Sequence, residues 1–131
     1  MLHLSFDRAH RVLRVTVSGI FASADMEELD RVVIVALARE GEPMRGIYDY
    51  TEVEAFAVPR SRLVQRAQQP AIMRGQRVIV ASRVQGGEGA RDYGRHQREA
   101  GEKDAVVVRT LEEAYEVLGL SQPNFEPFDA R

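Results

Sequence analysis

The first stretch of the chain alternates between apolar and polar residues. Leu2, Leu4 and Phe6 occupy every second position, and the same period returns over residues 13–17 after a short polar break. A period of two is typical of a strand that has one face against the core. Two such stretches joined by a short connection predict an antiparallel hairpin at the N-terminus.

After Gly19 the apolar period changes to that of a helix. Ser23 precedes several acidic residues, which predicts an N-cap there, and the helix would end near Arg39, just before Gly41. The run Val32–Val35 is rich in branched residues, so a strand is the competing prediction for that run. We favour the helix because both of its ends carry capping signals, and the extra apolar surface then needs a second partner.

The remaining elements alternate between strand and helix. Short, nearly continuous apolar runs such as Arg77–Ala81 are typical of parallel strands that are covered on both faces. We predict strands at 44–50, 77–81 and 105–108, helices at 59–69, 88–100 and 110–118, and a connection over 51–58. The order ββαβαβαβα predicts an α/β fold with a mixed, mostly parallel sheet of about five strands and about four helices.

Length and composition indicate one ordinary globular domain. The chain has 131 residues, of which 44% are hydrophobic, so we expect a single domain over 1–120 and a C-terminal tail over 121–131. The tail carries Phe125 and Phe128, which would either cover the chain's own core or reach across a dimer.

Two absences in the sequence narrow the class of protein. There is no cysteine, which excludes disulfide scaffolds and cysteine nucleophiles. The first ten residues lack a basic start, and the longest apolar run is far shorter than the roughly 20 residues of a membrane span. We therefore expect a cytoplasmic protein without a membrane segment.

Several motifs in this order suggest a known family. The third strand ends in Tyr48-Asp49-Tyr50-Thr51-Glu52-Val53, and the second half contains an arginine-led buried strand, Gly89-Ala90-Arg91-Asp92-Tyr93 and a glutamate-rich last helix. Over roughly residues 2–120 the chain resembles the STAS domains of bacterial anti-sigma-factor antagonists, and its second half resembles the SpoIIAA-like, STAS/SEC14-type branch. The resemblance implies that fold, a cytoplasmic setting, and recognition of a protein or a small ligand.

One departure from that family limits what the resemblance implies. Phosphorylatable antagonists carry a serine that opens the helix after the third strand, but Val58-Pro59-Arg60 has no hydroxyl and Ser61 is displaced into the helix. The phosphoserine switch therefore does not carry over to this chain.

A glycine turn between a buried strand and a predicted helix is a candidate ligand site. Free backbone N–H groups at such a turn favour an anion, although glycine turns also form for backbone reasons alone. Asp49 ends the third predicted strand, where open α/β sheets bind ligands. The candidate ligand-binding residues are Asp49, Ser82, Gly86, Gly87, Gly89 and Arg91.

Charge is unevenly distributed along the chain. The net charge is −2, but residues 60–98 hold nine arginines against Glu88 and Asp92. Arg91, Arg95 and Arg98 would share one helix face, which could bind nucleic acid or an acidic partner, or be a solvated face. We favour the solvated face because few aromatic residues accompany these arginines, so nucleic acid is not an expected partner.

The sequence offers no recognisable catalytic pattern. Its three histidines lie in different predicted elements without metal-ligand spacing, and no serine lies in a nucleophile elbow. We therefore expect no catalytic residues, no metal and no cofactor.

These observations lead to two main hypotheses. The first is a non-enzymatic regulatory module that binds a protein partner or a second copy of itself, using Val32, Ile34, Phe56, Arg60 and Arg62. The alternative is a carrier or sensor of a small anionic or lipid-like ligand at the strand ends and the glycine turn.

Overall fold

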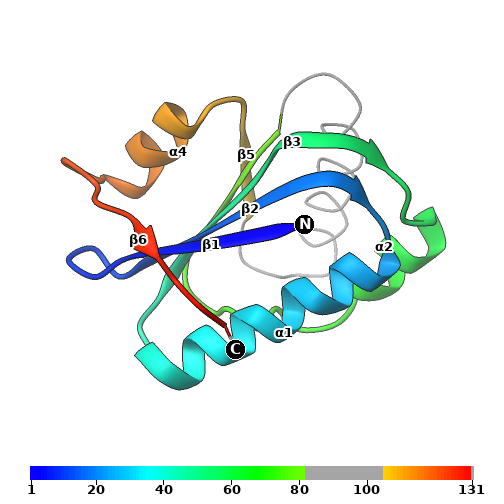
Figure 1. Cartoon of the computed structure of the whole chain (residues 1–131), viewed down its shortest axis with the longest axis horizontal. Coiled ribbons are helices and arrows are strands. Elements are labelled where there is room, and N and C mark those ends of the chain that lie inside the picture. The colour runs from blue at the N-terminus through cyan, green and yellow to red at the C-terminus, as the bar shows by residue number, and fades with distance from the viewer. Residues whose placement is uncertain (82–104, 131) are drawn as a thin grey trace.

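The part of the chain that the structure describes forms a mixed, six-stranded sheet with helices on both faces (Figure 1). The computed structural model describes residues 1–81 and 105–130. The strands are β1 Leu2–Asp7, β2 Val12–Phe21, β3 Arg45–Phe56, β4 Arg77–Val80, β5 Ala105–Val108 and β6 Glu126–Pro127, and the helices are α1 Ser23–Glu40, α2 Arg60–Ala67 and α4 Leu111–Leu118. The strand order is β5-β4-β3-β2-β1-β6, in which β2 to β5 are parallel and β1 is antiparallel to both neighbours. The α/β class and the N-terminal hairpin are thus confirmed.

The sheet has one strand more than the five that we predicted, and the extra strand comes from the tail. β6 pairs with β1 through Ser5 opposite Pro127 and Phe6 opposite Glu126, and the Phe128 N–H donates to the Leu4 carbonyl at 2.9 Å. A two-residue strand that contains proline leaves no local sequence signal, since only its long-range pairing defines it. The tail therefore packs on its own chain. The helix predicted at 88–100 lies outside the described residues.

Helix α1 forms over Ser23–Glu40, so the competing strand over Val32–Val35 is wrong. Its predicted cap is also corrected, because the N-cap is Ala22 and Ser23 is already helical. The Ala22 N–H donates to the Asp25 carboxylate at 2.8 Å, which replaces a hydroxyl cap. Within residues 1–81 and 105–130, no helix is both long and apolar enough to cross a membrane.

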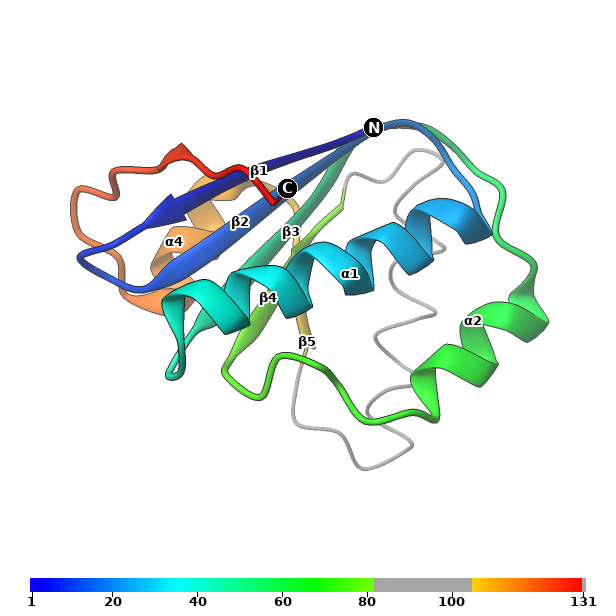
Figure 2. The ribbon, with the colours of Figure 1, turned by 60° about the horizontal axis from the view of Figure 1, so that its bottom comes forward.

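Each face of the sheet has its own hydrophobic core. Figure 2 shows α1 and α2 in front of the strands and α4 behind them. The core under α1 is the larger, and its members include Leu13, Val15, Phe21, Val33, Met73 and Ile79. The core under α4 consists of Val12, Ile47, Val78, Val80, Ala114 and Leu118. Adjacent residues in β2, β3 and β4 thus point alternately into the two cores.

Strand β3 continues past the predicted end at Tyr50 and runs to Phe56 beside β2. The register between the two strands shifts twice, between Thr16 and Ser18 and again between Gly19 and Ile20. These irregularities let β3 hold more residues than β2 over the same length. Most of the stretch that we predicted as a connection over 51–58 is therefore the last part of a long strand.

Candidate ligand site between helices α1 and α2

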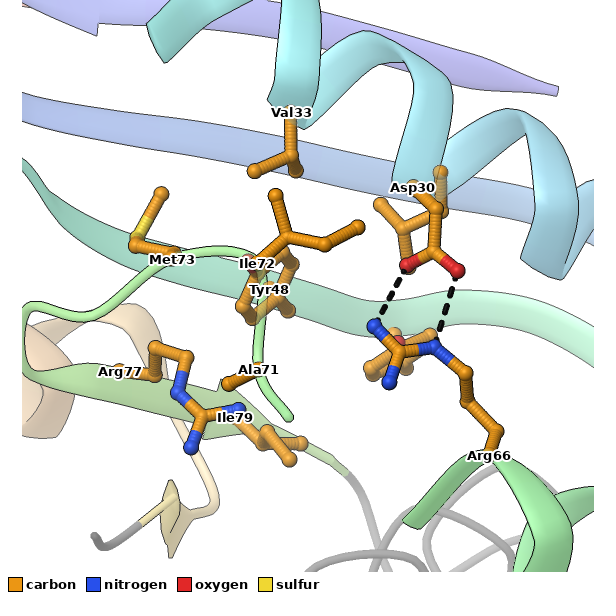
Figure 3. A pocket seen from close by; sticks show the side chains of 11 residues that line it. Asp30, Val33, Tyr48, Arg66, Ala71, Ile72, Met73, Arg77 and Ile79 are labelled. Atoms are coloured by element: carbon orange, nitrogen blue, oxygen red, sulfur yellow. Dashed lines mark hydrogen bonds and ion pairs between the residues drawn. The ribbon is translucent and has the colours of Figure 1, made fainter. Parts of the chain in front are cut away.

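Two small cavities lie between α1, α2 and the sheet. The first has a volume of about 40 Å³ and lies over β3 and β4, next to the connection over 68–76 (Figure 3). The second has a volume of about 30 Å³ and lies near the start of α1 and the end of β3. Leu29, Asp30 and Tyr50 line both cavities, so they are two compartments of one cleft.

An ion pair between the two helices lies beside these compartments, since Asp30 lines both of them and Arg66 lines the first. The Arg66 guanidinium on α2 donates from Nε and Nη2 to the two carboxylate oxygens of Asp30 on α1, at 2.9 and 3.0 Å. The Arg66 side chain is only 7% exposed, whereas that of Asp30 is 33% exposed. A two-point guanidinium–carboxylate contact is the strongest geometry for this kind of pair. It holds α2 against α1 across the cleft.

Further polar side chains reach the first cavity from the sheet. Arg77, the first residue of β4, is a buried arginine that lines it, and Tyr48 and Tyr50 of β3 line it as well. Figure 3 shows Arg77 and Arg66 approaching this region from different elements. The rest of the lining is apolar: Leu29, Val33, Ala71, Ile72, Met73 and Ile79. Two arginine side chains therefore line a space whose walls are mainly hydrocarbon.

Strand alternation explains why these side chains meet. Tyr48 on β3 is opposite Ile79 on β4, and Gly46 is opposite Arg77, so all four positions belong to the face under α1. Gly46 also leaves room for the connection over 68–76, because a Cβ there would lie 2.6 Å from the Met73 sulfur. Met73 thereby packs directly on β3 and closes one side of the first cavity.

The second compartment is more apolar than the first. Phe21, Tyr50 and Phe56 form an aromatic cluster, with ring centroids 5.0 Å apart for Phe21 and Phe56 and 5.5 Å apart for Phe21 and Tyr50. Met26 of α1 and Leu63 of α2 complete the wall. This compartment suits a hydrocarbon or aromatic group.

The structure does not place the predicted ligand residue Asp49 at this cleft. Asp49 lies in the middle of β3, opposite Val80, and not at the end of the strand. Its carboxylate accepts hydrogen bonds from the Thr51 backbone N–H at 2.9 Å and the Thr51 hydroxyl at 2.7 Å, next to the first register shift. Asp49 also alternates with Tyr48 and Tyr50, which puts it on the other face of the sheet. The remaining predicted ligand residues, Ser82, Gly86, Gly87, Gly89 and Arg91, lie outside the described residues.

The predicted partner-binding residues do not form one apolar surface. Val32 is 2% exposed and belongs to the core under α1, whereas Ile34 is 53% exposed on the outer side of the helix. Phe56 is half-buried in the aromatic cluster and Arg60 is exposed. Arg62 forms an ion pair with Glu27 of α1 at 3.6 Å. The partner that the run Val32–Val35 needs is largely the chain itself, including the tail residue Phe128.

Sequence reasoning missed the central pair of this site, Asp30 and Arg66. One signal was available, since Asp30 lies on the helix stripe of Met26 and Val33, where a carboxylate interrupts apolar residues. A carboxylate on the apolar stripe of a helix favours a cationic partner, but the sequence does not say which arginine supplies it. The separation of 36 residues between Asp30 and Arg66 is set by the fold alone.

A wider hollow lies elsewhere on the molecule and has a different character. It has a volume of about 360 Å³, opens to solvent, and lies between the start of β1, α1 and the tail. The cation on its rim is engaged, since Arg31 binds Glu28 at 2.9 Å and the Ala130 carbonyl at 3.3 Å. We therefore take the α1–α2 cleft, with its buried arginines, as the candidate site.

The arrangement of histidines and carboxylates and the comparison with known proteins both bear on the function of the cleft. Among the described residues no group of three or more histidines and carboxylates is arranged to hold a metal ion. A comparison of the chain with models of known protein families and with curated proteins found no match.

Proposed function

We propose that this chain is a non-enzymatic binding module of STAS-like type that takes a small anionic molecule with an apolar body. The observation that carries the proposal is the α1–α2 cleft, in which buried Arg66 and Arg77 line space that is otherwise walled by hydrocarbon. Concave, mostly apolar sites with a few convergent polar groups are typical of small-molecule binding.

The chemistry of the cleft favours one class of ligand. A guanidinium is always charged and presents parallel N–H donors that match a carboxylate, and the aromatic rings of Tyr48 and Tyr50 add to the lining. The first cavity, at about 40 Å³, has room for about three water-sized groups, which excludes bulky polyanions such as nucleotides. These constraints favour a compact monoanion over a bulky polyanion.

The STAS-like part of the proposal rests on topology and on the family resemblance. A hairpin followed by alternating strands and helices matches the order that the resemblance implies. Helix α2 begins at Arg60 after the N-cap Pro59, so a hydroxyl is absent where those relatives are phosphorylated. In this proposal a bound ligand takes the place of the phosphate as the regulatory signal, in the bacterial cytoplasm.

An NMR titration tests the ligand proposal. Hexanoate is the probe and hexanol, which has the same chain without the charge, is its control. We expect saturable shifts of the Leu29, Tyr50 and Arg66 amides with hexanoate and at least tenfold weaker binding of hexanol. Arg77→Gln should weaken hexanoate binding about tenfold, because it removes one positive charge from the lining of the cleft. A tenfold change in affinity corresponds to roughly 1.4 kcal/mol. The matched control Arg74→Gln changes an exposed arginine in the neighbouring connection and should have no effect. Equal binding of both probes would refute the proposal.

A second function, binding of another copy of the chain, is favoured by one observation. β3 extends past Asp49, but among the described strands none pairs with its β4 side over Thr51–Phe56. An open strand edge is a template for pairing with another strand. Glu52 and Glu54 on this strand lie close in sequence to Arg60, so opposite charges are available to two copies. Native mass spectrometry should then give a dimer, with slow amide exchange over 51–56, and a monomer at all concentrations would exclude it.

A further inference from the structure

We infer that the bound anion is a monocarboxylate that replaces Asp30 at Arg66, and that α2 moves away from α1 when it binds. This inference rests on the proposed function, and it adds both the class of the ligand and the change in the protein. Three features of the cleft support it: the unequal burial of the ion pair, the contact of Asp30 with both cavities, and the construction of α2.

The two partners of the ion pair differ in how easily they can separate. Arg66 is 7% exposed and cannot remain without an anion, because a buried unpaired charge is strongly unfavourable. Asp30 is 33% exposed, so its carboxylate can rotate into water. A ligand carboxylate can accept the same two hydrogen bonds from Nε and Nη2 that Asp30 accepts now. Asp30 is therefore the group that leaves.

The size of the cavities requires the pair to open. Each compartment, at about 40 and 30 Å³, is too small for a carboxylate together with a hydrocarbon chain. Asp30 lines both compartments, so loss of its contact with Arg66 would let its side chain move and open space between them. The carboxylate would then lie at Arg66, and the apolar part would lie against the aromatic cluster of Phe21 and Phe56.

Helix α2 is built to be the element that moves. It has eight residues, and its N-cap Pro59 makes no side-chain capping bond. Helices shorter than about 12–15 residues are marginal on their own, so its position depends on contacts such as Leu63 and Arg66. Helix α1 has 18 residues, five of which are buried, and is anchored along the sheet.

Movement of α2 would change the protein surface at the start of that helix. Arg60 and Arg62 lie in the first turn of α2, and Arg62 is linked to Glu27 of α1. When α2 moves, this ion pair breaks and the basic start of the helix changes its position relative to α1. Ligand binding is thereby coupled to the surface that a partner contacts.

The affinity test uses Asp30→Asn. Removal of the competing carboxylate should tighten hexanoate binding about five- to tenfold, whereas Arg66→Lys, which loses the two-point contact, should weaken it at least tenfold. The matched control Glu28→Gln removes an exposed carboxylate that pairs with Arg31 on the same helix, and it should leave affinity unchanged. Thermal melts of each variant check that it is folded.

A distance measurement tests the movement directly, on a background that keeps Asp30 and Arg66. The chain has no cysteine, so Ile34→Cys on α1 and Gln65→Cys on α2, both at exposed positions, accept spin labels only there. Hexanoate should shift the distance distribution between the labels to longer values, and Asp30→Asn should produce part of that shift without hexanoate. If the wild type binds hexanoate but the distances do not change and Asp30→Asn binds no tighter, this inference is wrong while the proposed function stands. If neither protein binds hexanoate, the proposed function itself fails.

Discussion

The two faces of the sheet carry arginines in different surroundings. On the face under α4, Arg14 donates to the Tyr115 hydroxyl at 2.8 Å and lies 4.5 Å from the centre of the Phe125 ring, and Arg45 donates to the Leu118 carbonyl at 2.7 Å. On the face under α1, Arg66 and Arg77 line a cleft that is only partly filled. Arginine therefore contacts a helix on both faces, but beside filled space under α4 and beside unfilled space under α1.

Both ends of the chain also contact each other on the face under α4. The Asp7 carboxylate accepts hydrogen bonds from the His10 backbone N–H and imidazole at 2.9 Å each, and from the Asn124 N–H at 2.8 Å. Phe125 then stacks on Tyr115 with their ring centres 5.9 Å apart. The tail thus joins the hairpin to α4, whereas α2 is held by two ion pairs with α1, Asp30–Arg66 and Glu27–Arg62.

The largest expected effect compares two buried leucines, one on each face. Leu118 is 4% exposed in the core under α4, and Leu63 is 6% exposed beside the 30 Å³ cavity. Leu118→Ala should lower the free energy of unfolding by about 4 kcal/mol, and Leu63→Ala by about 2 kcal/mol, because α2 can close on the space that is left. Urea denaturation of both variants measures the difference. Equal losses would mean that the two faces are equally well packed.

Low pH should weaken the contacts that the Asp7 carboxylate makes on the face under α4. Burial raises the pKa of Asp7, but the hydrogen bonds from His10 and Asn124 outweigh it and hold that pKa below its ordinary value of 3.8. A lowered folded-state pKa adds stability above the ordinary value, and this stability is lost as the pH falls through the folded-state pKa, so the loss begins below about pH 4. Asp7→Asn should lower the free energy of unfolding by about 2–3 kcal/mol at pH 7 and make unfolding less dependent on acid.

Exposed Glu116 supplies the control for the acid prediction. Glu116→Gln should leave both the stability at pH 7 and its acid dependence unchanged, since this carboxylate is solvated. If Asp7→Asn and the wild type lose stability in parallel below pH 4, the Asp7 carboxylate is not what ties the tail to the hairpin.

Elements with a local sequence signal could be predicted, whereas features that depend on long-range contacts could not. The hairpin, helix α1 and the last helix were predictable because each carries its own apolar period, and the Thr110 cap was visible in the sequence. The pair Asp30–Arg66 and the strand β6 were not, since each depends on residues that only the fold brings together. The end of the third strand was predicted too early, since β3 continues to Phe56 through its pairing with β2, which is also a long-range contact.

A larger side chain should destabilise the face under α4 more than the face under α1. Ala114 of α4 is fully buried, whereas Ala71 lines the first cavity of the cleft. Ala114→Leu should lower the free energy of unfolding by about 2 kcal/mol through overpacking, and Ala71→Leu should change it by less than about 0.5 kcal/mol because space is present. Thermal denaturation of the two variants measures this. Ala71→Leu should also weaken hexanoate binding, which separates filling of the cleft from a general effect on the fold.

The smallest expected effect concerns how the helix on each face is capped. The Thr110 hydroxyl accepts a hydrogen bond from the Glu113 N–H at 3.1 Å, and Gly119 ends α4 with φ of 65°, whereas α2 has no side-chain cap. Thr110→Ala should therefore lower the free energy of unfolding by about 1 kcal/mol, and Thr110→Ser, which keeps the oxygen, should recover most of it. Amide exchange gives the decisive measurement: the change should speed exchange in α4 and leave exchange in α2 unchanged. If exchange in α2 rises equally, the two faces unfold as one unit, and the independence of α2 that its movement requires is lost.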